Sequence, residues 1–568
     1  MQRYILDIEA DNLLNDVTTI HCVVLRDPDT DKVLTFHGKN LQRCIPVMEE
    51  ADQLIGHNLI GYDMPALEKL WQWSFKGDIL DTLVCSRTIW PNLMQLDAER
   101  KKIPTKLWGS HSLKAWGYRL QQFKGDYGEQ EQAWDVFTME MLDYCVQDTA
   151  VTLELHKRIN LVDFSEDALA LEHRMAKQLF LQEQRGFVFN ESKAEALFST
   201  LAQRKAEIED QLIATFEPTV VNLKTKVKVI PFNPASRQQI ADRLMKRGWE
   251  PKDFTPSGEP KVDESVLKGI DMPEAALLSE YLLLAKRLGQ VGTGKQAWLK
   301  LVKNGKLHGR CNHMGAVTSR CTHSNPNIGQ VPSVGAPFGK ECRELFTVPQ
   351  GYSLLGADAS GLELRCLAHF TALYDNGAYG KEILNGDIHT ANQKAAGLES
   401  RSQSKTFIYG FLYGAGDAKI GAITGKGAKE GKKIKKKFLD RTPALKKLRE
   451  AVNKAAEKGW IKGLDQRRIP VRHSHAALNT LLQSCGSILC KRWYIRITEL
   501  LEANSYTNED VSIVAFVHDE VQVQVKKGLE EKVGELIIRA MHDTEQYYKF
   551  RCPLDAEYKY GDNWADTH

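Results

Sequence analysis

The stretch FVHDEVQVQV, residues 516–525, decides how this sequence is interpreted. The apolar run SIVA precedes it, and after Glu520 valine alternates with glutamine, which is the period-two pattern of a half-buried strand. The sequence therefore predicts two strands that flank His518, Asp519 and Glu520, with no Gly or Pro between them. Two adjacent carboxylates and a histidine are a poor choice for a stable hairpin tip, so we interpret them as part of a functional site.

The chain as a whole has the composition of a globular protein. Its 568 residues predict three or four domains or subdomains. No apolar run reaches the roughly 18 residues that a membrane span needs. Met1 leads almost at once into YILDIEAD, so we expect no signal peptide. The eleven cysteines form no CxxC pair, which indicates reduced thiols in a cytosol.

Charge is distributed unevenly along the chain. Residues 1–160 hold 17 Lys and Arg against 24 Asp and Glu, whereas the remainder holds 59 against 49. A basic larger part favours a polyanionic partner, and an acidic first part could hold metal ions.

Two motifs resemble binding sites but lack essential features. GQVGTGKQ, residues 289–296, has Gln where a phosphate-binding loop needs Ser or Thr, and it follows a helical pattern, so we interpret it as a helix end. HGRCNHMGAVTSRCTH carries two CxH pairs, whose spacing does not fit a zinc knuckle. Those pairs are formed by Cys311, His313, Cys321 and His323.

An acidic constellation lies near the N-terminus. Asp7 and Glu9 are two apart on a predicted strand and so share one face. Carboxylates about 4 Å apart repel by roughly 4 kcal/mol at an effective dielectric of about 20, so such a cluster is stable only with bound cations. Oxygen ligands select Mg²⁺ or Mn²⁺. The segments GHNLIGYD and DYCVQDTAVTLELH add further polar candidates, which are Asn58, Asp63, Tyr144 and Asp148.

A second constellation follows a predicted strand that ends at Asp358. Glu363 and Arg365 come next, and the segment RSQSKTFIYGFLYGAG spaces two cations and two aromatics at steps of four: Arg401, Lys405, Tyr409 and Tyr413. On a helix these four would form a stripe about 18 Å long. Cations followed by aromatics suit a triphosphate followed by a sugar and base. An amphipathic helix with core tyrosines would give the same spacing.

The first constellation resembles the DEDD 3′–5′ exonucleases of the tyrosine variety, whose pattern is DxE, NxxxxD and YxxxD. The resemblance implies that two metal ions are held by four carboxylates, with Tyr144 helping to place the attacking water. Those carboxylates would be Asp7, Glu9, Asp63 and Asp148.

The second constellation, together with VHDE, resembles motifs A, B and C of family A DNA polymerases, most closely those of podoviruses of the T-seven type. The resemblance implies an α/β multi-domain fold, with a ribonuclease-H-like exonuclease domain followed by a right-hand polymerase domain. The expected divisions are an exonuclease domain over 1–162, a thumb with connecting helices over 163–306, palm over 307–365, fingers over 366–474 and palm with the motif C hairpin over 475–568.

The resemblance also implies roles for individual residues. Asp358, Ala359 and Asp519 would form the metal site with two Mg²⁺, and the exonuclease site would hold two more, with Mn²⁺ as a substitute. Lys405 would bind phosphates and assist catalysis, together with Arg401 and His389. Glu363 with Tyr409 would exclude ribonucleotides, and Tyr413 would stack near the template base. His518 and Glu520 would support the primer end. Four residues would contact the minor groove of the new duplex: Arg320, Gln330, Asn479 and Gln483.

The sequence departs from the T-seven type in the thumb. A long basic insertion that binds host thioredoxin is represented here only by EPTVVNLKTKVKVIPFNP, residues 217–234, so thioredoxin binding is not expected. Lys224, Lys226 and Lys228 in this segment would instead touch phosphate or solvent. The fingers around EKGWIKGLD also look shortened, and no 5′-nuclease domain precedes Asp7.

These observations lead to a functional hypothesis. We expect a replicative phage DNA polymerase that adds dNTPs to primer–template DNA and proofreads, acting in the cytoplasm of an infected bacterium. A phage primase–helicase and a single-strand-binding protein are the expected partners, and no membrane is involved. Two alternatives remain, a cellular or prophage repair polymerase of the same family and a catalytically silent DNA-binding scaffold.

Overall fold

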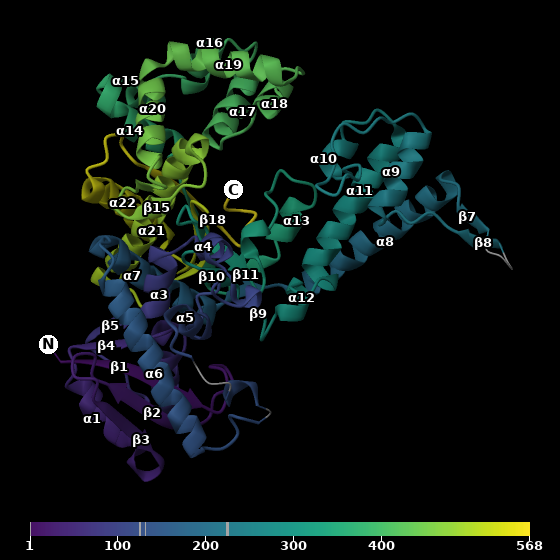
Figure 1. Ribbon diagram of the computed structural model, residues 1–568. Coiled ribbons are helices and arrows are strands. Elements are labelled where there is room, and N and C mark those ends of the chain that lie inside the picture. Colours follow the sequence, from purple (N-terminus) through teal and green to yellow (C-terminus); the bar gives the residue numbers. More distant parts are fainter. Residues whose placement is uncertain (1, 124–126, 131, 223–226) are drawn as a thin grey trace. The chain divides into compact units, whose positions relative to one another are not determined.

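The computed structural model describes residues 2–123, 127–130, 132–222 and 227–568 (Figure 1). The chain divides into two compact units, and each has its own hydrophobic core. The first unit comprises Met1–Arg185, Cys311–Thr322 and Leu355–Tyr560. The second unit comprises Gly186–Arg310, His323–Leu354 and Gly561–His568.

The N-terminal part of the first unit is a five-stranded sheet of order β3-β2-β1-β4-β5. Its central strand β1 (Arg3–Ala10) pairs antiparallel with β2 and parallel with β4. Alternation along β1 buries Leu6 and Ile8 and leaves Asp7 and Glu9 half-buried on the opposite face. The other strands are β2 (Ile20–Arg26), β3 (Val33–His37), β4 (Gln53–Gly56) and β5 (Asp78–Asp81).

Helices surround this sheet, and side chains cap the first turn of several of them. Asp81 caps α3, Ser112 caps α5 and Thr138 caps α6, each by accepting a main-chain amide of the first turn. The long α6 packs against β1 and β2. The helices are α1 (Cys44–Glu49), α2 (Met64–Trp71), α3 (Thr82–Ile89), α4 (Leu93–Arg100), α5 (Leu113–Leu120), α6 (Met139–Asn160) and α7 (Glu166–Arg185).

A second sheet in the first unit has the order β16-β17-β13-β18. All seven residues of β16 (Val511–Val517) are buried, and β17 (Glu520–Lys526) keeps the predicted alternation with both faces largely covered. Helices α21 (Ala477–Ala503) and α22 (Glu530–Tyr548) pack together, and the Trp493 indole donates to the carbonyl of Ile537 over 2.9 Å. The other two strands are β13 (Tyr352–Ala359) and β18 (Ala556–Gly561).

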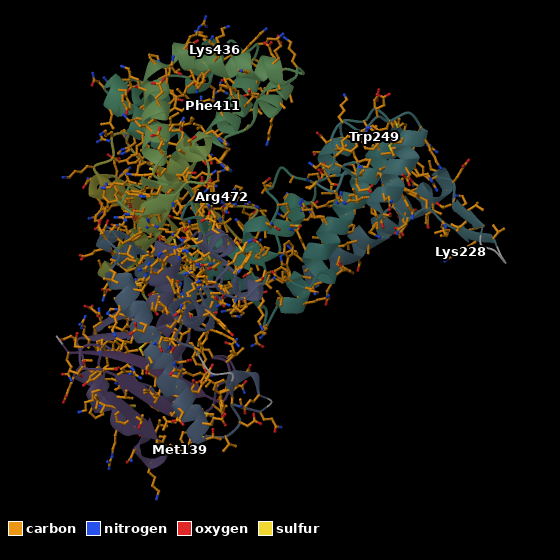
Figure 2. The ribbon with its side chains drawn as sticks, in the orientation of Figure 1. Met139, Lys228, Trp249, Phe411, Lys436 and Arg472 are labelled. Carbon is orange, nitrogen blue, oxygen red and sulfur yellow. The ribbon has the colours of Figure 1, made fainter. Side chains whose placement is uncertain are left out.

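The segment between β13 and α21 is mostly helical. Its lysine-rich helix α19 buries Ile434 and Phe438 and exposes most of its lysines, including Lys436 (Figure 2). Its elements are α14 (Leu362–Asp375), α15 (Ala378–Asn385), α16 (Ile388–Ala396), α17 (Arg401–Leu412), α18 (Asp417–Ala422), α19 (Ala428–Arg441), α20 (Pro443–Ala456), β14 (Trp460–Lys462) and β15 (Arg468–Pro470).

The second unit is built on two long helices and a small sheet. Helices α8 (Glu191–Thr215) and α11 (Pro273–Leu288) pack together, and the segment Gly289–Thr293 continues the helical path, which agrees with the interpretation of GQVGTGKQ as a helix end. The small sheet consists of β6, β9 and β12. Its residues Phe187 and Phe346 form an aromatic cluster with Trp564. The remaining elements are β6 (Phe187–Phe189), α9 (Arg237–Lys246), α10 (Glu264–Leu267), α12 (Trp298–Leu301), β9 (Lys306–Leu307), α13 (Gly339–Arg343) and β12 (Phe346–Thr347).

The shortened segment 217–234 forms a hairpin of β7 (Thr219–Asn222) and β8 (Val227–Ile230). Lys228 is exposed on β8 (Figure 2), whereas Lys224 and Lys226 lie outside the described residues. Two short strands, β10 (Arg310–Asn312) and β11 (Thr322–Ser324), complete the description. Within the described ranges, none of the helices is both long and apolar enough to cross a membrane.

The packing of α18 against α19 depends on Gly431. A Cβ at this position would lie 1.9 Å from the carbonyl oxygen of Asp417, so the two helices could not keep their separation. We expect Gly431→Ala to destabilise this helix pair by about 1–3 kcal/mol, the usual cost of overpacking. Native-state proteolysis should then cleave residues 413–441 faster than in the wild type.

Gly427→Ala is the matched control, because a Cβ at Gly427 meets nothing within 4 Å. Its effect should be smaller and limited to the loss of a glycine N-cap. Equal cleavage rates for the two variants would contradict the packing argument.

Candidate active site

Strand β13 and the β16–β17 turn meet through a main-chain hydrogen bond. The amide of Ala359 donates to the carbonyl of Asp519 over 3.1 Å. His518 has a left-handed backbone with φ of 59°, so the turn closes in two residues between the paired Val517 and Glu520. Asp358 and Asp519 are thereby brought to neighbouring positions at one edge of the sheet.

The electrostatics of this edge favour a cation. Burial and the negative charge of Asp519 together raise the pKa of Asp358 to about 7. Burial also raises the pKa of Asp519, with Glu363 adding to the effect. Carboxylate oxygens are the ligands that Mg²⁺ and Mn²⁺ prefer, so the donor set fits divalent metal ions.

A pocket of about 260 Å³ opens beside the turn, and its lining includes Arg320, Glu363, Tyr413 and Asp519. The Tyr413 hydroxyl donates to Glu363 Oε1 over 2.5 Å. The guanidinium of Arg320 lies 3.9 Å from the same oxygen and 6.0 Å from the centre of the Tyr413 ring. Glu363 therefore bonds Tyr413 here, and its expected action with Tyr409 on the ribose stays a prediction.

Helix α17 carries the predicted cation and aromatic stripe. A capping box between Ser400 and Gln403 starts the helix just before Arg401. Arg401 and Lys405 are exposed and Tyr409 is half-buried, whereas Tyr413 lies one residue beyond the helix end.

A carboxylate on the neighbouring helix engages the first cation of the stripe. Arg401 Nε donates to Asp387 Oδ2 over 2.8 Å, and Asp387 also caps α16. This pairing lowers the pKa of Asp387. The ring of His389 lies 6.3 Å from that of Tyr409, so His389 is close to the stripe.

Helix α21 presents a stripe of half-buried polar residues at intervals of four, which are Asn479, Gln483 and Ser487. Ser487 lines the pocket, and Asn479 donates to the carbonyl of Leu412 over 2.5 Å. Gln330 belongs to the second unit, where its carbonyl accepts from the Gln290 side chain over 3.0 Å.

The N-terminal carboxylates form a separate site on β1. One ligand atom from each of Asp7, Glu9 and Cys145 lies within 4.8 Å of the others, an arrangement that could hold a metal ion. The Cys145 thiol donates to Asp7 Oδ2 over 3.2 Å. Asp63 joins them, because its Oδ1 accepts the amide of Ile8 over 3.2 Å.

The acidic side chains of this second site influence one another. Burial, together with the negative charges of Asp81 and Asp148, raises the pKa of Asp63 to about 7. Asp148 is itself buried on α6. Tyr144, on the same helix, has its ring 5.7 Å from that of Tyr127 and 5.9 Å from that of Trp134.

Comparison with known proteins assigns the chain to a family. A family model for DNA polymerase family A matches residues 199–566. The chain belongs to DNA polymerase family A. The match includes Asp358, α17 and the β16–β17 turn, whereas the N-terminal carboxylates lie before it.

Relatives and a solved structure agree with this assignment. The chain is 37% identical to the DNA-directed DNA polymerases of Escherichia phage T7 and Enterobacteria phage T3, with 99% of each protein covered. The fold matches the polymerase domain of Pol1 from M. smegmatis, solved with a DNA primer–template and dNTP, with a TM-score of 0.79 and 17% identity. That match covers 99% of this chain and 96% of the solved one. The protein is a DNA-directed DNA polymerase of the phage type.

Three polar residues of the polymerase lie near these sites but were not predicted from the sequence. Asp387 pairs with Arg401, Cys145 contacts Asp7, and Asp81 accepts the amides of Asn58 and Ile60 in the turn that leads to Asp63. The position of Asp387 before a helical pattern was a usable N-cap signal. Cys145 carried no such signal, because nothing in its neighbours indicates a contact with β1.

The raised pKa of Asp63 predicts a pH dependence of stability in EDTA. Its carboxyl has a higher pKa in the folded state than in the unfolded state, so its contribution to stability is present below about pH 4 and is lost as the pH rises through about 7. Asp63→Asn removes this loss, and it should raise the melting temperature at pH 8 but leave it unchanged near pH 4. The gain at pH 8 should be at most about 4 kcal/mol.

Differential scanning calorimetry at both pH values checks this expectation. The same experiment with Mg²⁺ should stabilise the wild type at pH 8 and have less effect on the variant. A variant that is less stable than the wild type at pH 8 in EDTA would contradict the electrostatic argument.

Proposed function

We propose that this polymerase replicates phage DNA, with primer extension at Asp358 and Asp519 and proofreading at the N-terminal site. The observation that carries the proposal is the main-chain bond between Ala359 and Asp519, which keeps two carboxylates together although each raises the cost of ionising the other. An arrangement of this kind is useful only if a cation binds there.

Two metal ions would be held at the polymerase site by Asp358, Asp519 and the main chain of Ala359. When bound, they lower the pKa of the primer 3′-OH and neutralise the triphosphate. Arg401, Lys405 and His389 would bind phosphate oxygens, with Lys405 assisting catalysis. Arg401 would have to exchange its bond to Asp387 for the incoming phosphates.

Residues in the pocket and on α17 would distinguish correct from incorrect substrates. Tyr409 and Glu363 would crowd the ribose 2′ position, and Tyr413 would stack near the template base after releasing Glu363. Further contacts would follow the primer–template, with His518 and Glu520 at the primer end and four residues in the minor groove: Arg320, Gln330, Asn479 and Gln483. These roles follow from the family resemblance, and the solved relative with DNA and dNTP supports the same two ligands here.

The N-terminal site would remove mispaired 3′ ends. Asp7, Glu9, Asp63 and Asp148 would hold two metal ions, and Tyr144 would help to orient the attacking water. The proximity of Asp7, Glu9 and Asp63 and the influence of Asp148 on the pKa of Asp63 support this proposal. The central position of β1 in its sheet gives these side chains a rigid base.

The length of the chain relative to its relatives bears on the partners of this polymerase. The alignment with the phage T7 polymerase extends over 703 positions, whereas this chain has 568 residues, so the relative carries segments that are missing here. This difference and the short β7–β8 hairpin support the expectation that host thioredoxin does not bind. A phage primase–helicase and a single-strand-binding protein in the host cytoplasm fit a replicative role. The similarity to phage polymerases over 99% of the chain favours replication over cellular repair.

The two activities should be separable by mutation. Asp7→Ala with Glu9→Ala should abolish degradation of single-stranded DNA and leave primer extension within about twofold, because the two carboxylate sites lie on different sheets. Asp519→Asn should abolish extension and leave degradation. Gel assays with labelled primers in Mg²⁺ measure both, and loss of both activities in either variant would refute the proposal of two sites. Extension by the wild type would also exclude the silent scaffold.

Tyr409 should control the use of dideoxynucleotides. By family resemblance, its hydroxyl replaces the hydrogen bond that a missing 3′-OH would make, so the wild type should terminate readily and Tyr409→Phe should terminate far less. Tyr413→Phe is the matched control, since it removes a hydroxyl that bonds Glu363 instead. The ratio of dideoxynucleotide to deoxynucleotide incorporation gives the result, and equal ratios for wild type and Tyr409→Phe would rule out this role.

A further inference from the structure

Helix α7 carries two adjacent polar residues, Glu172 and His173, on different faces. Successive residues of a helix are rotated by about 100°, so the two side chains reach different neighbours. Glu172 is fully buried and His173 is half-buried. Every contact that follows lies within the first unit.

Glu172 is the centre of a buried ionic cluster. Its Oε1 lies 2.6 Å from Lys491 Nζ and 2.7 Å from Arg467 Nη1, and Arg467 pairs in turn with Asp465. None of these four side chains is more than 4% exposed. Buried charges are tolerated only with complete pairing and accurate geometry. The four side chains of this cluster must therefore keep their positions relative to one another.

The cluster fixes the start of the loop that ends at Arg320. His313 Nδ1 donates to Glu172 Oε2 over 2.8 Å, and burial lowers the pKa of His313 to about 4, so the imidazole is neutral. The sulfur of the next residue, Met314, lies 3.6 Å from both Arg467 Nη1 and Lys491 Nζ.

The same loop returns on itself at Arg320. The amides of Gly315 and Ala316 donate to the carbonyl of Arg320 over 3.1 and 3.2 Å. Ser487 of α21 donates to the carbonyl of Ser319 over 2.7 Å. The contacts therefore run from Glu172 through His313 and the main chain of the loop to the carbonyl of Arg320, whose side chain lines the polymerase pocket.

His173 begins a second series that leads to the N-terminal site. Its Nδ1 donates to the carbonyl of Leu169 over 2.8 Å, which leaves Nε2 to accept the amide of Asp81 over 2.9 Å. The Asp81 carboxylate accepts the amides of Asn58 and Ile60. That turn ends at Asp63, which contacts the main chain of β1 between Asp7 and Glu9.

We propose that Glu172 and His173 are positioning residues, Glu172 for the polymerase site through His313 and Arg320, and His173 for the exonuclease site through Asp81 and Asp63. The proposal rests on the proposed roles of Arg320 in primer–template binding and of Asp63 in degradation. Two adjacent residues of α7 would thus support both reactions.

His313→Leu tests the polymerase side without disturbing the ion pairs. Leucine removes the donor to Glu172, and His313 Nε2 makes no hydrogen bond among the described residues, so the change sacrifices no other such bond. We expect the KM for primer–template to rise about tenfold, with kcat within about twofold. His313→Asn should restore most of the affinity, because its side-chain amide donates from a position close to that of Nδ1.

A double-mutant cycle separates positioning from general damage. In an Arg320→Ala background, His313→Leu should cause little further increase in KM, since the group it positions is gone. Degradation of single-stranded DNA should be unchanged by His313→Leu. An additive effect of the two changes, or a normal KM for His313→Leu, would overturn the polymerase half of the proposal.

His173→Ala tests the other side. The maximal rate of single-strand degradation should fall about tenfold, His173→Gln should recover it to within about threefold by supplying an acceptor near Nε2, and primer extension should stay unchanged. An unchanged degradation rate for His173→Ala, or no recovery with His173→Gln, would overturn this half.

Failure of the proposed function can be distinguished from failure of the positioning proposal. If the wild type does not degrade DNA, or if Arg320→Ala binds primer–template normally, the proposed function is wrong at that site. If these reference results are as expected and the α7 and His313 variants behave differently from the stated outcomes, the positioning proposal alone is wrong.

Discussion

Two like-charged carboxylates, Asp358 and Asp519, are held beside each other by the main chain of their sheet. Their mutual repulsion opposes the folded state until a cation binds, so other parts of the fold must supply the opposing free energy. Fully buried strand β16 and the packed helices α21 and α22 supply it. In the proposed function, the pocket and the α17 stripe would act on a nucleotide only while this edge of the sheet stays in place.

Local signals in the sequence were sufficient to predict much of the architecture. Alternating valines predicted β17, and the spacing of Asp7 and Glu9 placed both on one face of β1. Period-four spacing predicted the stripe on α17, although Tyr413 lies just beyond its end. Each of these patterns is decided by residues close together in the chain, where backbone geometry alone relates one side chain to the next.

Contacts between distant residues could not be predicted in this way. Tyr413 bonds Glu363 across 50 residues, and His313 reaches Glu172 across 141. A buried glutamate within the helical pattern of α7 looks the same in the sequence as a solvated one. Only the fold shows that Lys491 and Arg467 neutralise it. The site residues recognised through family motifs were therefore easier to find than the residues that support them.

The adjacency of Glu172 and His173 also limits how α7 can evolve. Insertion of one residue between them would rotate one partner set by about 100° and shift it by about 1.5 Å, so no single-residue change in length here preserves both series of contacts. Exposed positions such as Lys177 should tolerate substitution by other residues. The β7–β8 hairpin, by contrast, can lengthen or shorten between lineages with little effect on either core. Selection on chain length should thus act on this helix far more strongly than on that hairpin.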